Sequence, residues 1–477
     1  MARTTIRTED ITADAVTAAK IASGAVDLSG VTANQDDIAL LGFKVAANGS
    51  LARYNLVDQS IDAFEDASGV DASASTNEIR NASKYYSGGS STAGSSATFT
   101  TAETTSWTAP AGLATVEYLV VGGGGAGGTG YGPSGGGGAG GFRTATGFAV
   151  SGGSSYTVTV GAGGASADGA SVSAAGEDGE DSVFSSITSN GGGGGGGGGD
   201  NAADGGSGGG GNYADNPAGA GNTPSTSPVQ GYAGGLGGDN TKSSWAAGGG
   251  GGASEVGEAA MRTSSANDGG DGGDGIASSI TGAAVTYAGG GGGATDESGT
   301  EGQGGAGGGG NGCHKSGGGG YTPVAATNGT ANTGSGGGGA GWNNSPPNTV
   351  SGAGGSGIVV IKWDTYNAPA DLTLVSNAQT AQSAPTTGDL VITYTDGAGT
   401  AVVNTDIKAY ISRDGSAYTS AVTLVSQGTT GGHTILTANG VDLSGVATGT
   451  SMRWKITTHN QGASKETRIQ AVSLGWS

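Results

Sequence analysis

Hydrophobic positions follow three different patterns along the chain. In the first part an apolar residue recurs every five positions from Ile11 to Val31, a spacing that fits neither a helix nor a strand. In the middle, short apolar groups stand between runs of glycine, and toward the end apolar and polar residues alternate. These changes predict three parts: an N-terminal segment with a linker at residues 1–94, a glycine-rich domain at 95–365 and a β domain at 366–477.

The alternating part at 366–477 is typical of a β-sandwich or jelly roll. Turn signals such as Asp396-Gly397 and Asp414-Gly415 separate its apolar stretches. The predicted strands cover residues 372–375, 389–394, 406–411, 422–425, 434–436, 452–456 and 469–474. Short strands at this density favour two packed antiparallel sheets, whose role could be carbohydrate binding, clamping of a trimer or both.

The N-terminal part combines several signals. Its five-residue period predicts an extended β thread that is stable only when wound with copies of itself, and a flexible tail is the alternative. The spacing of apolar residues over 38–45 predicts a short helix that ends at Asn48-Gly49. A second apolar stretch spans 57–64, and Ser87–Ser96 has the composition of a Gly/Ser linker.

Glycine runs dominate the middle part of the chain, from Tyr118 to Trp363. Nine runs hold four or more glycines, and the longest is Gly191–Gly199. A flexible linker is one interpretation, because ordering glycine costs more backbone entropy than ordering any other residue. The length of the region and the apolar groups inside it favour an ordered domain instead. These groups lie at 156–160, 183–187 and 283–287.

An ordered glycine run can form a polyglycine II helix, which has three residues per turn and no internal hydrogen bonds. Its amides and carbonyls point outward and must bond to neighbouring helices, which the missing Cβ atoms allow to approach. Val116–Val121 and Gly357–Trp363 bracket the region as strands that could pair and close it. The predicted fold is therefore mostly β and fibrous: an extended N-terminal segment with short helices, packed polyglycine II helices closed by strands, and a C-terminal β-sandwich.

Acidic residues interrupt the glycines at a period of three. Asp268, Asp271 and Asp274 would form one edge of a threefold helix. Calcium needs several oxygen ligands on one ion, but successive carboxylates along such an edge would stand about 9 Å apart. A solvated acidic edge is therefore the favoured interpretation.

Composition agrees with a repetitive β architecture better than with one large apolar core. Hydrophobic residues make up 34% of the chain and aromatic residues 5%, whereas charged residues, which disordered chains usually have in excess, make up only 12%. The formal net charge of −21 disfavours binding to nucleic acids or to anionic membrane surfaces. No apolar stretch is long enough for a transmembrane helix, and the first residues lack the apolar core of a signal peptide.

The chain offers little material for catalysis. Cys313 is the only cysteine, so an intrachain disulfide and a Cys-x-x-Cys metal site are excluded. His314 follows it directly, but the partners of a catalytic dyad normally meet through the fold and not through the sequence. No glycine run leads into the Lys-Ser/Thr of a phosphate-binding loop. We therefore expect no enzymatic activity, no metal and no cofactor.

Aromatic residues beside the glycine runs are the candidate binding residues. They are Tyr131, Tyr213, Tyr232, Trp245, Tyr321 and Trp342. Most stand where a bundle would turn back, and exposed aromatic rings on turns suit stacking on sugars or gripping the loops of an outer-membrane protein. The alternative is that they cap the bundle and shield its ends from water. Trp245 and Trp342 are the preferred receptor contacts.

An ordered series of motifs resembles the glycine-rich domain of bacteriophage tail fibres and adhesins. The motifs are Thr98–Thr101, Trp107–Gly125, Val183–Gly192 and Gly354–Trp363. The resemblance implies packed polyglycine II helices with receptor-binding loops between them. Residues 37–81 are similar to the N-terminal segment of structural proteins of marine bacteriophages, which implies a virion-attachment module, and 366–477 resembles the terminal domains of phage fibres.

These resemblances imply a phage tail fibre or receptor-binding protein that is made in the host cytoplasm and carried on the virion. The implied partners are two further copies in a homotrimer, tail or baseplate adaptor proteins at the N-terminus, and a glycan or outer-membrane protein on the host surface. Multivalency would strengthen the adhesion. A structural virion fibre or head decoration protein without a receptor, a depolymerising tailspike and a secreted non-viral surface protein are the alternatives. The helices could pack within one chain or across three.

Overall fold

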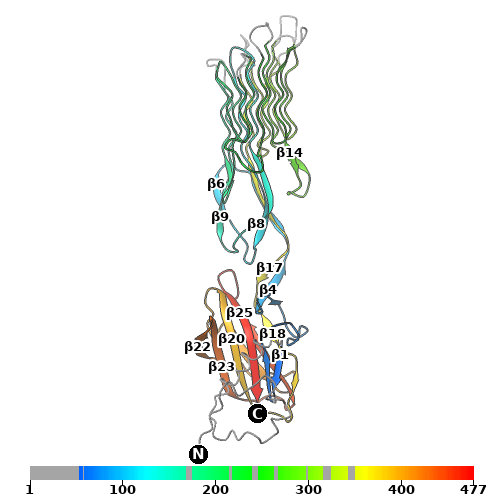
Figure 1. Ribbon diagram of the computed structural model, residues 1–477, viewed down its shortest axis with the longest axis vertical. Helices are drawn as coiled ribbons and strands as arrows, with labels where there is room; N and C mark the ends of the chain where they lie inside the picture. The colour runs from blue at the N-terminus through cyan, green and yellow to red at the C-terminus, as the bar shows by residue number, and fades with distance from the viewer. Residues whose placement is uncertain are drawn as a thin grey trace, which may run out of the picture. The chain divides into compact units, whose positions relative to one another are not determined.

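The protein is described here by a computed structural model. It describes residues 53–56, 58–167, 174–213, 217–238, 245–262, 267–296, 299–314, 324–341 and 350–477. These residues form β-strands and no helix, which confirms the expected mostly β fold. The five-residue period at 11–31 and the helix expected over 38–45 lie outside them. The chain divides into two compact units, one made of Met1–Ser90 with Pro369–Ser477 and the other of Ser91–Ala368 (Figure 1).

The first of these, the discontinuous unit, consists of two antiparallel sheets. One sheet has the strand order β1-β2-β25-β20-β23-β22, with β4 paired to β25 and β3 paired to β4. In the other sheet, β24 pairs with β18, β19 and β21. The strands are β1 (Arg53–Leu56), β2 (Gln59–Asp62), β3 (Glu78–Arg80), β4 (Tyr86–Thr92), β18 (Thr373–Val375), β19 (Gln379–Thr380), β20 (Thr387–Ala398), β21 (Ile407–Ser412), β22 (Val425–Thr430), β23 (His433–Asp442), β24 (Ser451–Thr458) and β25 (Glu466–Trp476). Strand β17 (Tyr366–Pro369) and β4 lie where the chain passes between the units.

One apolar core lies between these two sheets. Alternate residues of β24 point inward, among them Met452 and Trp454, as the period of two in the sequence predicts. The N-terminal segment adds Phe64 to the same core, with its ring centroid 4.9 Å from that of Tyr86 and 6.3 Å from that of Trp454. Because Phe64 is fully buried, its packing stabilises the unit by about 2–3 kcal/mol.

The unit boundaries differ from the predicted domains in one respect. The sequence placed residues 1–94 and 366–477 in separate domains, whereas in the structure β2 pairs with β25 and both parts share one core. Ser87–Ser96 is not a flexible linker, since β4 and β5 (Ser95–Phe99) form there. A Cβ at Gly88 would lie 1.9 Å from the carbonyl oxygen of Ala370, so the small residues of this segment serve close backbone packing.

Two details of the predicted β domain are also corrected. Asp396-Gly397, expected as a turn, lies within β20, where the pairing with β25 shifts register between Asp396 and Ala398. Of the strand expected at 422–425, only Val425 belongs to a strand, although Val422 and Leu424 are buried in the core as their alternation predicted. The other predicted strands overlap observed ones.

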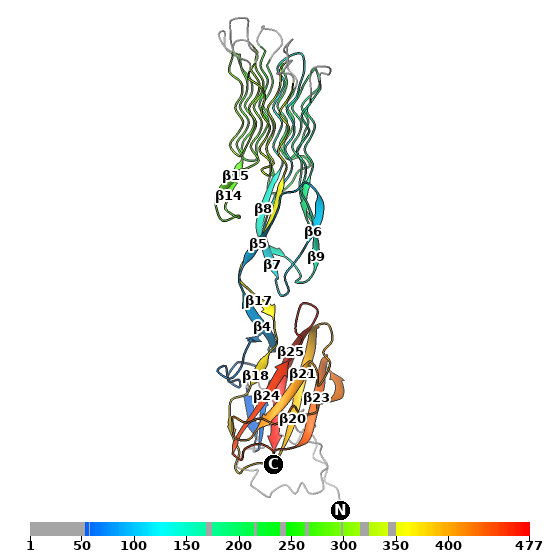
Figure 2. The ribbon, with the colours of Figure 1, turned by 180° about the vertical axis from the view of Figure 1, so that it is seen from behind.

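The second unit, residues 91–368, contains two small sheets and a bundle of glycine segments. The sheets have the orders β5-β16-β7-β8 and β11-β10-β9-β6, and two further pairs join β12 with β13 and β14 with β15. Figure 2 labels β5 to β9 and the β14–β15 pair. The bounds are β6 (Thr104–Thr108), β7 (Thr115–Val121), β8 (Phe142–Ala149), β9 (Ser155–Thr159), β10 (Ser182–Phe184), β11 (Ile187–Ser189), β12 (Met261–Arg262), β13 (Asn267–Asp268), β14 (Ile276–Ser278), β15 (Val285–Tyr287) and β16 (Ile358–Trp363). The two bracketing strands predicted from the sequence do pair, with Val121 opposite Ile358.

Apolar clusters cover both faces of the sheet that contains β7 and β16. On one face Tyr118 and Ile361 pack with Trp107 and Phe184 of the other sheet. On the opposite face Leu119 belongs to a cluster with two residues of the β14–β15 hairpin region, Ile280 and Tyr287. These clusters anchor the end of the glycine bundle at which the strands begin, called the strand end below.

The glycine segments run side by side in alternating directions and are joined by hydrogen bonds of period three (Figure 1). In segment 122–129 the amides of residues 122, 125 and 128 donate to segment 135–141, those of 123, 126 and 129 to 174–180, and those of 124 and 127 to 352–355. These donor–acceptor distances are 2.8–3.0 Å. Such a change of partner at every residue is the signature of a threefold extended helix, so the predicted polyglycine II packing is confirmed.

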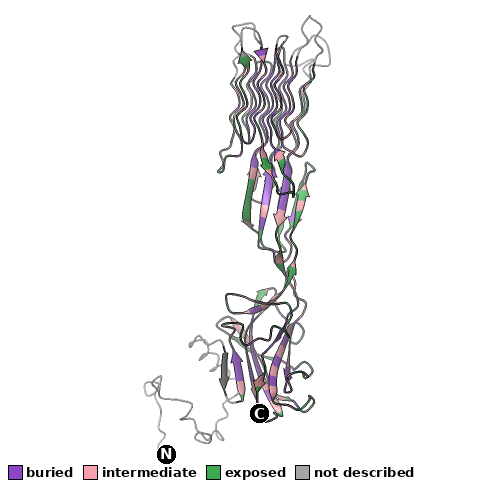
Figure 3. Cartoon of the chain, turned by 90° about the vertical axis from the view of Figure 1, so that its right-hand side faces the viewer, coloured by how far each residue is buried: buried purple, intermediate pink, exposed green. Residues whose placement is uncertain are grey.

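The same segment also accepts hydrogen bonds from three further segments. Amides of Gly164, Gly192 and Gly337 donate to carbonyls of residues 124, 123 and 125. The segment therefore has six neighbours, all from the same chain, and it is buried along its length. Figure 3 shows that buried residues run through the bundle as a whole. At Gly127 the backbones are too close for a side chain, since a Cβ there would lie 2.0 Å from the carbonyl oxygen of Gly338.

Candidate functional site

Three of the candidate aromatic residues lie at the end of the bundle opposite the strands, called the loop end below. Tyr131 lies in the turn between segments 122–129 and 135–141. The ring of Tyr213 lies against Gly132 of that turn, where a Cβ would come within 2.3 Å of the ring, and its amide donates to the carbonyl of Pro133 at 3.2 Å. The turn thus positions both tyrosines.

Trp245 completes this group, defined as the loop-end aromatic cluster of Tyr131, Tyr213 and Trp245. The rings of Tyr213 and Trp245 are stacked, with centroids 5.0 Å apart and planes 21° apart. Both side chains are half-buried, whereas Tyr131 is 69% exposed. The stacked pair therefore covers this end of the bundle, and Tyr131 is the most exposed of the three residues.

The other three candidates do not join this cluster. Tyr232 is 40% exposed, but its amide and carbonyl bond to Gly252 and Gly208, which places it in the side of the bundle toward the strand end. Tyr321 and Trp342 lie outside the described residues. The structure therefore brings together three of the six predicted contacts, including one of the two preferred tryptophans.

The aspartates at period three do form one edge, but they are not merely solvated. Each carboxylate Oδ1 accepts a hydrogen bond from a backbone amide of the adjacent segment. The pairs are Asp268 with Thr300 at 2.8 Å, Asp271 with Gln303 at 2.6 Å and Asp274 with Ala306 at 2.7 Å. Within the described residues, no group of three His, Cys, Asp or Glu side chains is arranged to hold a metal ion.

Cys313 and His314 lie in one glycine segment near the loop end. Cys313 is buried, and this burial raises the pKa of its thiol to about 12. The thiol is therefore protonated at neutral pH and is a poor nucleophile. The backbone of His314 is paired with Val324, which makes the dipeptide part of the bundle framework.

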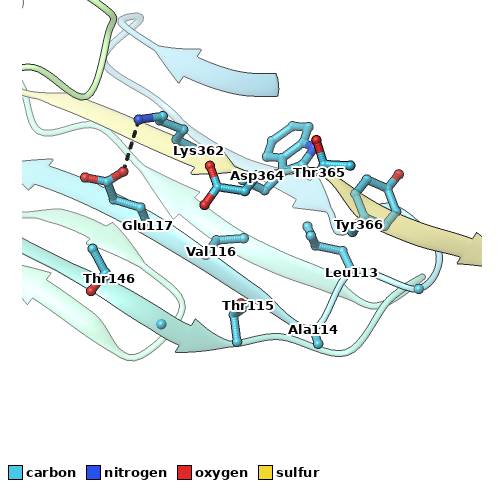
Figure 4. A pocket seen from close by; sticks show the side chains of 13 residues that line it. Leu113, Ala114, Thr115, Val116, Glu117, Thr146, Lys362, Asp364, Thr365 and Tyr366 are labelled. Carbon is cyan, nitrogen blue, oxygen red and sulfur yellow. Dashed lines mark ion pairs between the residues drawn. The ribbon is translucent and has the colours of Figure 1, made fainter. Parts of the chain in front are cut away.

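A separate pocket of about 220 Å³ lies at the far margin of the sheet that contains β7, β8 and β16 (Figure 4). The last pair between β16 and β7 is Lys362 with Glu117, and beyond it the two strands diverge. The Nζ of Lys362 lies 3.3 Å from Oε2 of Glu117. Asp364 and Tyr366 follow Lys362 along the chain and line one side of the pocket. Thr115 of β7 lines the opposite side.

A β-bulge shapes one wall of this pocket. The pairing of β7 with β8 shifts register between Val116 and Tyr118, so Thr146 and Gly147 together oppose Glu117. Gly147 has a φ of 72°, which favours glycine. This pocket was not predicted from the sequence, where the available signal was an isolated glycine inside an otherwise regular strand pattern.

These features define a glycine-rich β protein in which a self-contained polyglycine II bundle carries aromatic turns at one end. The chain belongs to the glycine-rich domain family, whose family model matches residues 99–364, more than half of the sequence. No curated protein sequence matches the chain significantly. No helix among the described residues is long and apolar enough to cross a membrane.

Proposed function

We propose that the protein is a bacteriophage tail fibre or receptor-binding protein that adheres to the host cell surface. In this proposal the N-terminal segment attaches to tail, baseplate or adaptor proteins of the virion, and three copies form the fibre. The glycine-rich unit carries contacts for a glycan or an outer-membrane protein. Membership in the glycine-rich domain family fits the glycine-rich unit of this proposal.

The loop-end aromatic cluster is the observation that carries the proposal. Tyr131 exposes 69% of its surface on a turn that Gly132, Pro133 and the stacked pair Tyr213–Trp245 hold in place. An exposed amphipathic ring on a rigid support loses little conformational entropy on binding, which is why tyrosine is frequent at binding hot spots. Each contact would be weak, and the copies on one virion would multiply its effect.

The test is adhesion of fluorescently labelled full-length protein to candidate host bacteria, comparing wild type with Tyr131→Ala. We expect the variant to lose at least tenfold in apparent affinity, because truncation of one hot-spot residue commonly costs about 2 kcal/mol. Tyr232→Ala is the matched control, since it removes an exposed tyrosine from the side of the same bundle. Unchanged thermal unfolding of both variants would show that the fold is intact.

Other outcomes favour the alternative functions. Wild-type protein that binds no candidate host would favour a structural fibre or a head decoration protein. Shortening of host surface polysaccharide during the incubation would favour a depolymerising tailspike. Truncation after residue 365 is unsuitable for this test, because it removes the strands that pair with the N-terminal segment.

A further inference from the structure

We propose that the pocket beside the β7–β8 bulge binds a single uncharged sugar ring. This site lies at the far margin of the sheet that contains β7, β8 and β16, and it shares no residue with the loop-end aromatic cluster. The inference therefore stands independently of the adhesion proposed for that cluster. Its volume of about 220 Å³ suits one small ring and is below the usual range for larger organic ligands.

Side chains from β7 and from the end of β16 line this pocket. Lys362 and Asp364 come from the end of β16 and the residue that follows it, and Tyr366 begins β17, where it packs against the apolar cluster that contains Trp107 and Val116. Thr115 and Glu117 come from β7, and Lys362 pairs directly with Glu117. Figure 4 shows the lining residues around one hollow, with Lys362 directed toward Glu117.

Several polar side chains of the pocket form no hydrogen bond within the described part of the protein. Among the described residues, the side chains of Asp364, Thr115 and Thr146 have no hydrogen-bond partner, and Thr365 adds a third such hydroxyl. A carboxylate accepts from two adjacent hydroxyls, and threonine hydroxyls both donate and accept. A ring with several neighbouring hydroxyl groups matches this set better than an apolar molecule does.

The remaining lining decides which face and which charge the ligand has. Half-buried Tyr366 offers an aromatic surface for the C–H face of a sugar, and Val116 and Leu113 form an apolar floor. Two carboxylates, Asp364 and Glu117, stand against one ammonium group, so the rim is net negative. An anionic ligand is therefore disfavoured. Because Lys362 forms an ion pair with Glu117, this carboxylate attracts a cationic ligand less strongly.

The bulge gives this pocket its shape. Two residues of β8, Thr146 and Gly147, stand opposite the single residue Glu117, and a Cβ at Gly147 would meet no atom within 4 Å. With regular pairing at this point, β8 would continue flat beside β7, and the wall that the bulge gives this pocket would be missing. Bulges of this kind commonly redirect side chains next to binding sites.

The test uses saturation-transfer NMR on the full chain with D-glucose, D-galactose, D-mannose and N-acetylglucosamine, each at about 10 mM, a concentration suited to millimolar affinity. D-glucuronate is the anionic counterpart of glucose. We expect transfer to at least one neutral sugar, weaker transfer to glucuronate, and at least a tenfold loss of affinity in Asp364→Ala and in Tyr366→Ala. Tyr232→Ala, which changes neither this pocket nor the loop-end aromatic cluster, should bind sugar as the wild type does.

Three results would overturn the inference. They are no transfer to any neutral sugar, transfer that persists unchanged in both Asp364→Ala and Tyr366→Ala, and stronger binding of glucuronate or of putrescine than of every neutral sugar. Thermal unfolding of the two variants controls for loss of fold. Loss of host-cell adhesion in Tyr131→Ala, with sugar transfer that is still reduced by Asp364→Ala and by Tyr366→Ala, would separate this pocket from the site proposed for adhesion.

Discussion

Single side chains at the margin of the bundle take over the role of missing backbone neighbours. A glycine segment at the margin of the bundle has backbone amides that face no carbonyl of a further segment. An amide without an acceptor is costly wherever water cannot reach it. Asp271 accepts from the amide of Gln303, and Asn328 accepts from the amide of Ala353 at 2.9 Å. The period of three placed such residues on one edge, but their bonding could be seen only once the neighbouring segment was known.

Asp271→Ala should therefore destabilise the second unit, whereas Asp271→Asn should not. The alanine variant loses an acceptor at 2.6 Å from the amide of Gln303, and we expect its free energy of unfolding to fall by about 1 kcal/mol. Asparagine keeps an oxygen at the same position. Urea unfolding of the full chain measures both, with Glu258→Ala as an exposed-carboxylate control. Equal losses in the alanine and asparagine variants would indicate that charge, not the acceptor, matters.

Asp406 predicts how the discontinuous unit responds to acid. Burial alone would raise the pKa of this carboxyl, but hydrogen bonds from Lys465, Asn460 and the amide of Val402 outweigh burial and hold the pKa at about 2. An unfolded aspartate titrates near pH 4, so the folded state binds the proton more weakly. Its contribution to stability is present above about pH 4 and is lost as the pH falls toward 2.

Measured unfolding free energies between pH 7 and pH 2 check this expectation. Asp406→Asn should be less stable than wild type at pH 7 and should lose less stability between pH 4 and pH 2. Some acid sensitivity should remain, because hydrogen bonds from Ser73 to Asp71 and from the Ser416 amide to Asp414 also lower those pKa values to about 2. A variant with the wild-type slope would show that Asp406 does not titrate over this range.

The elements of the bundle are stable only as a set. Fixing one backbone residue costs about 1–2 kcal/mol of entropy, while one net hydrogen bond contributes about 1 kcal/mol. Glycine has no side chain to add apolar burial, so close backbone contacts must supply the difference. A segment such as 122–129, with partners on all sides, meets this requirement, whereas an isolated one does not.

Gly127→Ala should consequently be far more damaging than an ordinary surface glycine substitution. Its Cβ would lie 2.0 Å from the carbonyl oxygen of Gly338, and two backbone segments would have to separate. We expect a loss of about 3 kcal/mol or more, the upper end for overpacking. Gly445→Ala, where a Cβ meets nothing within 4 Å, is the control and should be nearly neutral. Calorimetry of both variants would contradict this account if their unfolding temperatures were equal.

The elements that the sequence predicted well are those whose signal is local. Alternation identified most strands of the discontinuous unit, and period three identified the threefold helices. The partners of each glycine segment were not predictable, since Gly123 and Gly124 are identical residues that bond to different neighbours. The aromatic cluster was predictable only in part. Glycine runs locate the turns on which the aromatic residues stand, but only the packing of the segments shows that Tyr213 and Trp245 stack while Tyr232 lies elsewhere.

At the scale of the whole molecule, the glycine-rich unit is an insertion between the two halves of another unit. The amide of Ala370 donates to the carbonyl of Gly88 at 3.2 Å, so the two chain crossings are close on the side of the discontinuous unit. On the other side Ser95 pairs with Trp363. Each unit has its own apolar core, which predicts that each folds without the other.

Replacing residues 91–368 by a short Gly/Ser linker should leave a folded discontinuous unit, with one cooperative unfolding transition and the near-ultraviolet dichroism of a buried Trp454. Removing residues 53–90 from that variant as well should destabilise it by about 5 kcal/mol or more, because Ile61, Phe64 and Tyr86 each contribute roughly 2 kcal/mol of buried surface. Strand β25 would also lose β2 as its neighbour and expose an unpaired edge.

If residues 369–477 alone unfolded at the same urea concentration, the N-terminal segment would be a peripheral attachment and not part of the core. The expected loss of unfolding free energy would instead show that residues 53–90 are part of the core. The glycine-rich unit could then be removed without unfolding the discontinuous unit only if both halves of that unit were kept.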